Sequence, residues 1–183
     1  MCQHITEVKQ HTRLVILQHP AEAKNSKNTV RLLKLLTDNI EIHIGESRSD
    51  FLHLKDKILS NKDQYFLLFP GSQAKTFDSY QPAAERPVYN LIIIDGTWRK
   101  AKKLLHQNPW LAELRHLTLD SSYNAQYGIR KTSIDNGLST IEAVAYCLRE
   151  MENIELTPFF TALEGLKQNF TKLMPTKVAN RYK

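Results

Sequence analysis

The fold is decided by residues 91–98, which read LIIIDGTW. The first four are consecutive apolar residues with high β propensity, the pattern of a strand that is covered on both faces in a parallel sheet. A short turn through Asp95, Gly96 and Thr97 follows. Trp98–His106 then has apolar residues at helical spacing and basic residues largely on the other side. A strand, a turn and a helix in this order are the repeating unit of α/β domains, so this stretch predicts an α/β fold.

The rest of the chain continues the alternation of strands and helices. Short apolar runs and helical spacing predict strands at Leu14–Leu17, Ile40–Ile44, Tyr65–Phe69 and His116–Leu119, and helices at Thr29–Leu36 and Phe51–Leu59. Two later helices are indicated by their first residues: Ser139 and Glu142 have capping-box spacing, and Thr157 precedes a proline. We therefore expect one domain over residues 1–183, with a mostly parallel sheet covered by helices on both faces. Ligands in such sheets bind at the carboxyl ends of the strands.

Composition narrows the class of protein. The 183 residues are 42% hydrophobic, which is ordinary for a globular domain. No apolar run approaches the ~20 residues that span a membrane, and the N-terminus has no signal pattern. The two cysteines, Cys2 and Cys147, do not suggest a disulfide framework. We expect a cytoplasmic protein with no membrane association and no obligate protein partner.

The charge indicates a polyanionic partner. The chain has 25 Lys and Arg against 19 Asp and Glu, a net charge of +6, and its pI is near 9.3. Such a balance favours nucleic acid, because each phosphate contact releases counterions. The basic residues concentrate beside residue 95 and in the tail, at Arg99, Lys100, Lys102, Lys103, Lys172, Lys177, Arg181 and Lys183. The alternative is that these residues form only a solvated face.

Polar or glycine-containing turns follow the strands where a ligand is expected. They are Leu68-Phe69-Pro70-Gly71, Asp95-Gly96-Thr97-Trp98, and the loop from Tyr127 that reaches Leu138-Ser139-Thr140. Each also has a purely structural interpretation. Asp95 or Thr97 can cap the helix that follows, Trp98 can belong to the core, Ser139 can serve only its capping box, and Gly71 can serve only a turn.

Together these blocks resemble the DTW-domain family, which is named for the pattern Asp-x-Thr-Trp. The matching blocks are Leu17-Gln18-His19-Pro20 with Glu22, Asn28-Thr29, Phe69-Pro70-Gly71, Asp95-Gly96-Thr97-Trp98, Ile129-Arg130-Lys131 and Leu138-Ser139-Thr140-Ile141-Glu142-Ala143. The resemblance covers roughly Leu14 to Glu150. It implies a fold related to the knotted SPOUT methyltransferases, with S-adenosylmethionine held by loops at the strand ends. It also implies formation of 3-(3-amino-3-carboxypropyl)uridine in tRNA.

The resemblance gives these residues expected roles. Asp95 is the candidate general base that takes the proton of uridine N3. The expected donor-binding residues are Leu68, Phe69, Pro70, Gly71, Thr97, Trp98, Leu138, Ser139 and Thr140. Residues expected to hold RNA phosphates are Arg99, Lys100, Lys102, Lys103, Arg130 and Lys131. S-adenosylmethionine is the only cofactor required, because its sulfonium is already the leaving group.

One feature of the family is missing from the sequence. Many members begin with a cysteine cluster suited to zinc, whereas this chain offers only Cys2 and His4 there. Two ligands do not close a tetrahedral zinc site, so we predict no metal.

Two alternatives to the aminocarboxypropyl transfer are a SPOUT-like RNA methyltransferase and an RNA-binding module that has lost catalysis.

Overall fold

The structure, a computed structural model, describes residues 2–80, 89–120, 123 and 137–172. Its centre is a five-stranded sheet in the order β2-β1-β4-β3-β5, with all neighbouring strands parallel. The strands are β1 (Arg13–Gln18), β2 (Ile40–Ile44), β3 (Tyr65–Leu68), β4 (Asn90–Asp95) and β5 (Arg115–Leu117). The predicted α/β class and parallel sheet are therefore confirmed.

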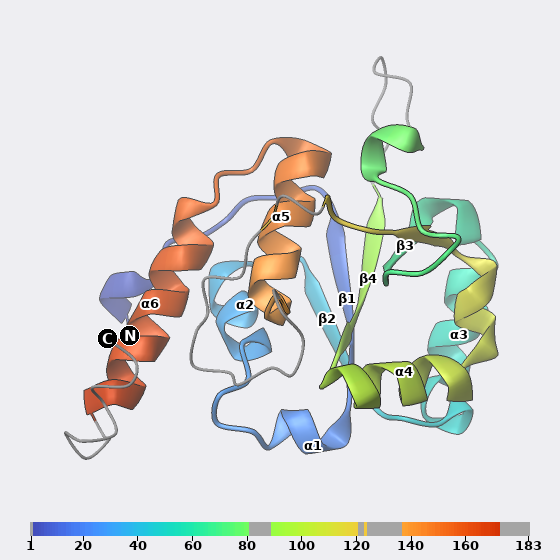
Figure 1. Ribbon diagram of the computed structural model, residues 1–183, viewed down its shortest axis with the longest axis horizontal. Helices are drawn as coiled ribbons and strands as arrows, with labels where there is room; N and C mark the ends of the chain where they lie inside the picture. The colour runs from blue at the N-terminus through green and yellow to red at the C-terminus, as the bar shows by residue number, and fades with distance from the viewer. Residues whose placement is uncertain (1, 81–88, 121–122, 124–136, 173–183) are drawn as a thin grey trace.

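Helices cover both faces of the sheet (Figure 1). One face carries α2 (Val30–Leu36), α5 (Thr140–Glu152) and α6 (Thr157–Lys172), and the other carries α3 (Leu52–Leu59) and α4 (Trp98–Gln107). The buried central strands explain this arrangement. Leu91 and Ile93 belong to the core under α2, α5 and α6, whereas Ile92 belongs to the core under α3 and α4. Alternate residues of one apolar strand thus supply two cores.

The expected element boundaries hold to within a few residues. Among the described residues, sequence reasoning missed α1 (Pro20–Ala23), a single turn whose N-cap is His19. It also missed several short 3-10 segments: η1 (Cys2–His4), η2 (Arg48–Phe51), η3 (Lys62–Gln64), η4 (Phe77–Ser79) and η5 (Pro109–Glu113). Between β3 and β4 the described residues form only one short helical segment, η4.

The cap of α5 is the one that the sequence predicts. Ser139 is the N-cap, and its backbone N–H and side-chain hydroxyl both donate to Glu142 Oε2, at 2.7 and 2.6 Å. The helix ends at Asn153, whose φ of 58° is the left-handed conformation typical of helix ends. The first turn of α5 is therefore held in place beside the carboxyl ends of the strands.

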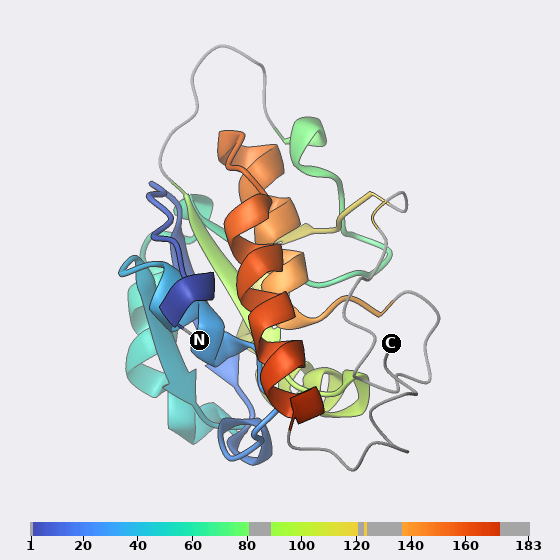
Figure 2. The ribbon, with the colours of Figure 1, turned by 90° about the vertical axis from the view of Figure 1, so that its left-hand side faces the viewer.

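The N-terminal turn packs against the last helix (Figure 2). The ring of His4 lies directly on Gly165 of α6, so closely that a Cβ at that position would stand 2.6 Å from His4 Cγ. A glycine is required there because any side chain would displace the turn. His4 thus has a packing role in this structure.

Candidate active site

The parallel strands bring the turns that follow them to one edge of the sheet, where the structure has a cavity of about 530 Å³. Its size is that of a typical small-molecule site. The walls come from the ends of β3, β4 and β5, from α4 and from the start of α5. The lining residues are Leu68, Phe69, Pro70, Ile93, Ile94, Gly96, Trp98, Ala101, Thr118, Leu119, Asp120, Tyr123, Gly137, Leu138, Thr140 and Ala143.

Two aromatic rings form one wall of the cavity. Phe69 and Trp98 stack in parallel, with centroids 5.3 Å apart and an angle of 2° between the planes. Phe69 is buried, but Trp98 is 40% exposed, so the interpretation of Trp98 as a core residue is wrong. The ammonium of Lys102 lies 5.3 Å from the centroid of the indole ring. This wall offers a flat apolar surface to a planar ligand.

Asp95 lies beneath this cavity and does not line it. Its side chain is fully buried, with 0% exposure. The carboxylate accepts three hydrogen bonds: Oδ2 from Gln18 Nε2 at 2.9 Å and from Asn28 Nδ2 at 2.7 Å, and Oδ1 from Thr140 Oγ1 at 2.6 Å. A charge buried this deeply requires such compensation. Thr97 occupies the N-cap position of α4, but its side chain makes no cap hydrogen bond. The hydrogen bonds of Asp95 come from Gln18, Asn28 and Thr140, so neither side chain caps this helix.

The donors to Asp95 belong to three different segments of the chain. Gln18 is the last residue of β1, Asn28 precedes α2, and Thr140 is the first residue of α5. Asn28 Oδ1 also accepts the backbone N–H of Val30 at 2.9 Å and so satisfies the start of α2. Asp95 therefore joins β1, β4 and the beginnings of two helices under the cavity floor. The only one of its donors that also lines the cavity is Thr140.

Six of the nine residues expected to bind the donor line the cavity: Leu68, Phe69, Pro70, Trp98, Leu138 and Thr140. The other three do not. Gly71 is exposed with open space around it, Thr97 is an exposed N-cap, and Ser139 is buried in its capping box. The main lining residues that sequence reasoning missed follow β5, at Thr118, Leu119, Asp120 and Tyr123. The rule that ligands bind at the carboxyl ends of strands would have found them.

The wall after β5 has ionisable groups, Asp120 and Tyr123, and Glu150 of α5 lies next to it. Tyr123 stacks on Tyr146 of α5, with centroids 4.2 Å apart, and its hydroxyl hydrogen-bonds to the Glu150 carboxylate. Burial raises the pKa of Glu150, and the negative charges of Asp78 and Asp120 raise it further, against the hydrogen bond from Tyr123. Burial and the Glu150 charge likewise raise the pKa of the Tyr123 hydroxyl. The negative charge of Asp120 therefore acts on both Tyr123 and Glu150.

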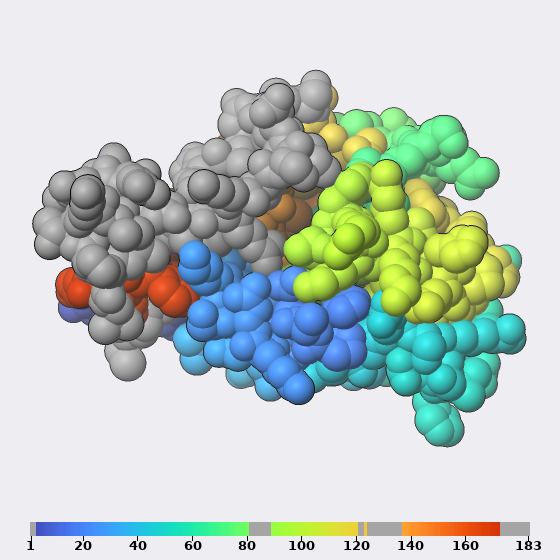
Figure 3. Space-filling view, turned by 60° about the horizontal axis from the view of Figure 1, so that its bottom comes forward, coloured from blue at the N-terminus to red at the C-terminus, as the bar shows by residue number. Residues whose placement is uncertain are grey.

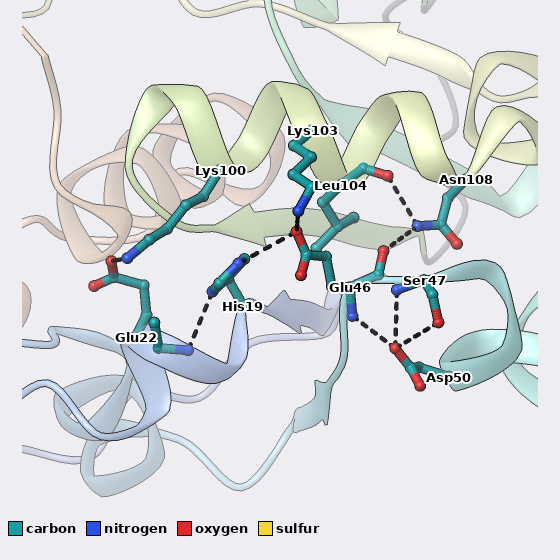
Figure 4. Close-up of polar contacts among 10 residues, drawn as sticks. His19, Glu22, Glu46, Ser47, Asp50, Lys100, Lys103, Leu104 and Asn108 are labelled. Carbon is teal, nitrogen blue, oxygen red and sulfur yellow. Dashed lines mark hydrogen bonds and ion pairs between the residues drawn. The ribbon is translucent and has the colours of Figure 1, made fainter.

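The basic residues of α4 differ in their surroundings, and Figure 4 shows the two that contact carboxylates, Lys100 and Lys103. Lys100 Nζ lies 2.8 Å from Oε1 of Glu22, whose side chain is 2% exposed. Lys103 Nζ lies 2.7 Å from Glu46 Oε1. Among the described residues no ion pair involves Arg99 or Lys102, and both side chains are exposed. Lys100 and Lys103 thus join α4 to neighbouring segments, while Arg99 and Lys102 face solvent.

The surface of α4 borders the surfaces of α1 and of the segment after β2 (Figure 3). A second hollow of about 390 Å³ lies there, lined by His19, Glu46, Arg99, Lys100 and Lys103. His19 Nδ1 accepts the Ala21 backbone N–H at 3.1 Å, and its Nε2 lies 3.5 Å from Glu46 Oε1. The expected RNA contacts Arg130 and Lys131 lie outside the described residues, as do Lys177, Arg181 and Lys183 of the tail.

Within the described part of the chain, no three His, Cys, Asp or Glu side chains are grouped as metal ligands would be. The expectation of no metal stays a prediction. No described helix has the length and apolar character needed to cross a membrane.

Comparison with known sequences identifies relatives of this chain. A sequence model of the DTW domain matches residues 1–176. Proteins named tRNA-uridine aminocarboxypropyltransferase 2 are similar to it. The Macaca fascicularis protein is 33% identical over 145 residues, 77% of this chain and 48% of that protein. The Mus musculus protein is 32% identical over 145 residues, with the same shares of 77% and 48%.

The Drosophila melanogaster protein of that name is 31% identical over 145 residues, 78% of this chain and 57% of its own length. This chain therefore spans about half the length of the curated relatives it matches. No solved structure gives a significant match.

Proposed function

Because the chain belongs to the DTW-domain family, we propose that it transfers the 3-amino-3-carboxypropyl group of S-adenosylmethionine to N3 of a uridine in tRNA. The relatives are named for transfer of this group to tRNA uridine. The observation that carries the proposal is the cavity at the strand ends, where six of the residues expected to bind the donor come together. A fold related to the knotted SPOUT enzymes is part of the same proposal, supported by the parallel sheet with its ligand-sized cavity at the carboxyl ends.

The reaction places a positioning requirement on this cavity. Uridine N3 attacks the methylene of the methionine chain, a C–N bond forms, the C–S bond breaks, and 5′-methylthioadenosine leaves with both electrons of that bond. The N3 proton passes to a base, which is the role that the sequence predicts for Asp95. The methyl carbon on the same sulfonium is also reactive, so the site must present the methylene in line and shelter the methyl. The rigid Phe69–Trp98 wall is suited to that task.

The surroundings of Asp95 favour a positioning role. The carboxylate has no exposed surface, and its two oxygens already accept three hydrogen bonds. A general base must come within hydrogen-bond reach of the proton that it takes. Asp95 instead holds Thr140, which does line the cavity, and with it the start of α5. Its role as the base stays a prediction, and an Asn variant separates the two roles.

The tRNA is held by phosphate contacts that carry no sequence information. Arg99 and Lys102, exposed beside the cavity wall, are the described residues best placed for them. Lys100 and Lys103 contribute less, because carboxylates already neutralise them.

A double-label experiment tests the proposed activity. Purified protein is incubated with tRNA and S-adenosylmethionine that carries one isotope in its methyl group and another in its methionine chain. Nucleoside mass spectrometry should find the chain label in uridine and the methyl label in 5′-methylthioadenosine. Methyl label in the RNA would establish a methyltransferase instead. Failure to bind S-adenosylmethionine would support the alternative of an RNA-binding module that has lost catalysis.

A further inference from the structure

The second hollow, beside α4, lies where the connections of the sheet change direction. β1 continues through α2 to β2 on one side, whereas β4 continues through α4 to β5 on the other side. The carboxyl ends of β1 and β4 therefore form the kind of crevice in which α/β sheets bind ligands. His19 follows β1 directly, and its backbone N–H donates to the carbonyl oxygen of Asp95 at 3.0 Å. This hydrogen bond places His19 at the crevice, where it lines the hollow.

The ring of His19 has an N–H group available for a ligand. Its Nδ1 accepts the Ala21 backbone N–H at 3.1 Å, so the proton of the neutral ring is on Nε2. Nε2 lies 3.5 Å from Glu46 Oε1, which is longer than a good N–H···O hydrogen bond. Figure 4 shows the ring between the ion pairs that Lys100 and Lys103 make. The Nε2–H group is therefore placed among cations and can donate to a further acceptor.

The hollow stays positively charged when its ion pairs are counted. Its lining contains three cations, Arg99, Lys100 and Lys103, and the carboxylate of Glu46. If Glu22, which holds Lys100, is counted as well, the cations still outnumber the carboxylates by three to two. Among the described residues no carboxylate pairs with Arg99, whose side chain is exposed. One excess positive charge beside an N–H donor suits a monoanion, and each phosphodiester of RNA is a monoanion.

We propose that this hollow binds one backbone phosphate of the tRNA, with the Nε2–H group of His19 and the guanidinium of Arg99 as its principal donors. The inference rests on the proposed function, because it takes tRNA as the partner. Lys103 is 59% exposed and can turn from Glu46 toward the phosphate. The turn that holds His19 through the Asp95 carbonyl oxygen continues into Gly96, which lines the donor cavity. A phosphate in the hollow thus positions the RNA relative to the donor.

Two substitutions of His19 separate phosphate binding from the structural role of this residue. Asparagine can keep the cap contact to Ala21 but does not reach the position of Nε2, whereas glutamine reaches that position but is not a preferred cap residue. His19→Asn should therefore weaken binding of an unmodified tRNA transcript roughly tenfold, the loss of one hydrogen bond to a charged group, at the wild-type melting temperature. His19→Gln should melt at a lower temperature and keep the wild-type affinity.

The salt dependence of tRNA binding distinguishes the two donors. Arg99→Gln removes a cation and should lower the log–log salt slope by about 1, whereas His19→Asn removes a neutral donor and should leave the slope unchanged. The matched control is His11→Asn, an exposed histidine before β1, at the opposite end of that strand from His19. This control should bind tRNA as the wild type does.

Three results would overturn the inference. Wild-type affinity in His19→Asn would exclude His19 from RNA binding and leave the proposed function intact. Equal weakening in His19→Asn and His19→Gln would give His19 a structural role only. Inorganic phosphate that raises the melting temperature of the wild type but not of His19→Asn, with equal tRNA affinities, would assign the hollow to free phosphate. Binding of tRNA that depends on His19 without transfer of the aminocarboxypropyl group would refute the proposed function and support this inference.

Discussion

Replacing Asp95 separates a general base from a positioning residue, and the structure gives the expected size of each effect. In Asp95→Asn, the amide oxygen can stand where Oδ2 accepts Gln18 and Asn28, and the amide nitrogen can donate to Thr140 Oγ1. The Thr140 hydroxyl accepts as well as it donates, so all three contacts survive. The loss is the difference between charged and neutral hydrogen bonds, partly offset by not burying a charge, or about 1–2 kcal/mol.

Asp95→Ala removes every acceptor. Gln18 retains a long contact to Asn28 Oδ1 at 3.3 Å, but Asn28 Nδ2 and Thr140 Oγ1 lose the acceptor that Asp95 provides. Each buried donor left unsatisfied costs about 1–3 kcal/mol, so we expect a loss of about 3–5 kcal/mol with the cavity included. For a chain of this size the melting temperature should fall by roughly 10 °C, against a few degrees for Asn.

Thermal melts, donor affinity and single-turnover rates on the same tRNA decide between the two roles. If Asp95 positions Thr140, the Asn variant should keep its donor affinity and a rate within about tenfold of wild type. Thr140→Val, which removes the hydroxyl, should then weaken donor binding, while Thr140→Ser should not. An Asn variant that melts and binds normally but turns over ~10²–10⁴-fold more slowly would refute the positioning role and identify Asp95 as the base.

Four further outcomes are expected. Lys100→Ala should cost about 1–3 kcal/mol in denaturant unfolding, because it removes the ammonium from buried Glu22, whereas Lys102→Ala should cost less than about 0.5 kcal/mol. The same Lys102→Ala variant should lower the log–log salt slope of tRNA binding by about 1, and an unchanged slope would place the RNA elsewhere. Backbone N–H donors of Glu46 and Ser47 hold the pKa of Asp50 below its usual value. The ionised Asp50 carboxylate therefore stabilises the folded protein above about pH 4, and this stabilisation is lost as the pH falls further. The melting-temperature gap between wild type and Asp50→Asn should therefore close in acid. Elemental analysis should find no stoichiometric zinc, and a chelator should leave the melting temperature unchanged.

Local sequence patterns were enough to predict the strands and the cap of α5. Four consecutive apolar residues at 91–94 favour a strand that is covered on both faces, the pattern typical of a parallel sheet between helix layers. The Ser139–Glu142 capping box is equally local, since its atoms lie within one helical turn. Such features depend on neighbours that the sequence itself places side by side.

Features that depend on distant segments could not be predicted in this way. Trp98 has the spacing of a core residue, but it stacks on Phe69 in the cavity wall and stays partly exposed. The sequence predicts a strand at His116–Leu119, but it does not show that the turn after this strand meets the turns after β3 and β4. The wall at Thr118, Leu119, Asp120 and Tyr123 was therefore missed. Lys100 was expected to face RNA, and its partner Glu22 lies 78 positions away.

The structure also explains why the blocks that resemble the family must occur together. The described blocks lie far apart in the sequence, but they contact one another: Gln18, Asn28 and Thr140 all donate to Asp95, and Phe69 stacks on Trp98. The block at Ile129-Arg130-Lys131 lies outside the described residues. A residue such as Asn28, which never reaches the cavity, is needed because Asp95 would otherwise be a buried carboxylate with one acceptor site unfilled. The pattern Asp-x-Thr-Trp therefore combines two requirements at one strand end. Its first residue ties the segments beneath the cavity together, and its last residue turns outward to form the wall.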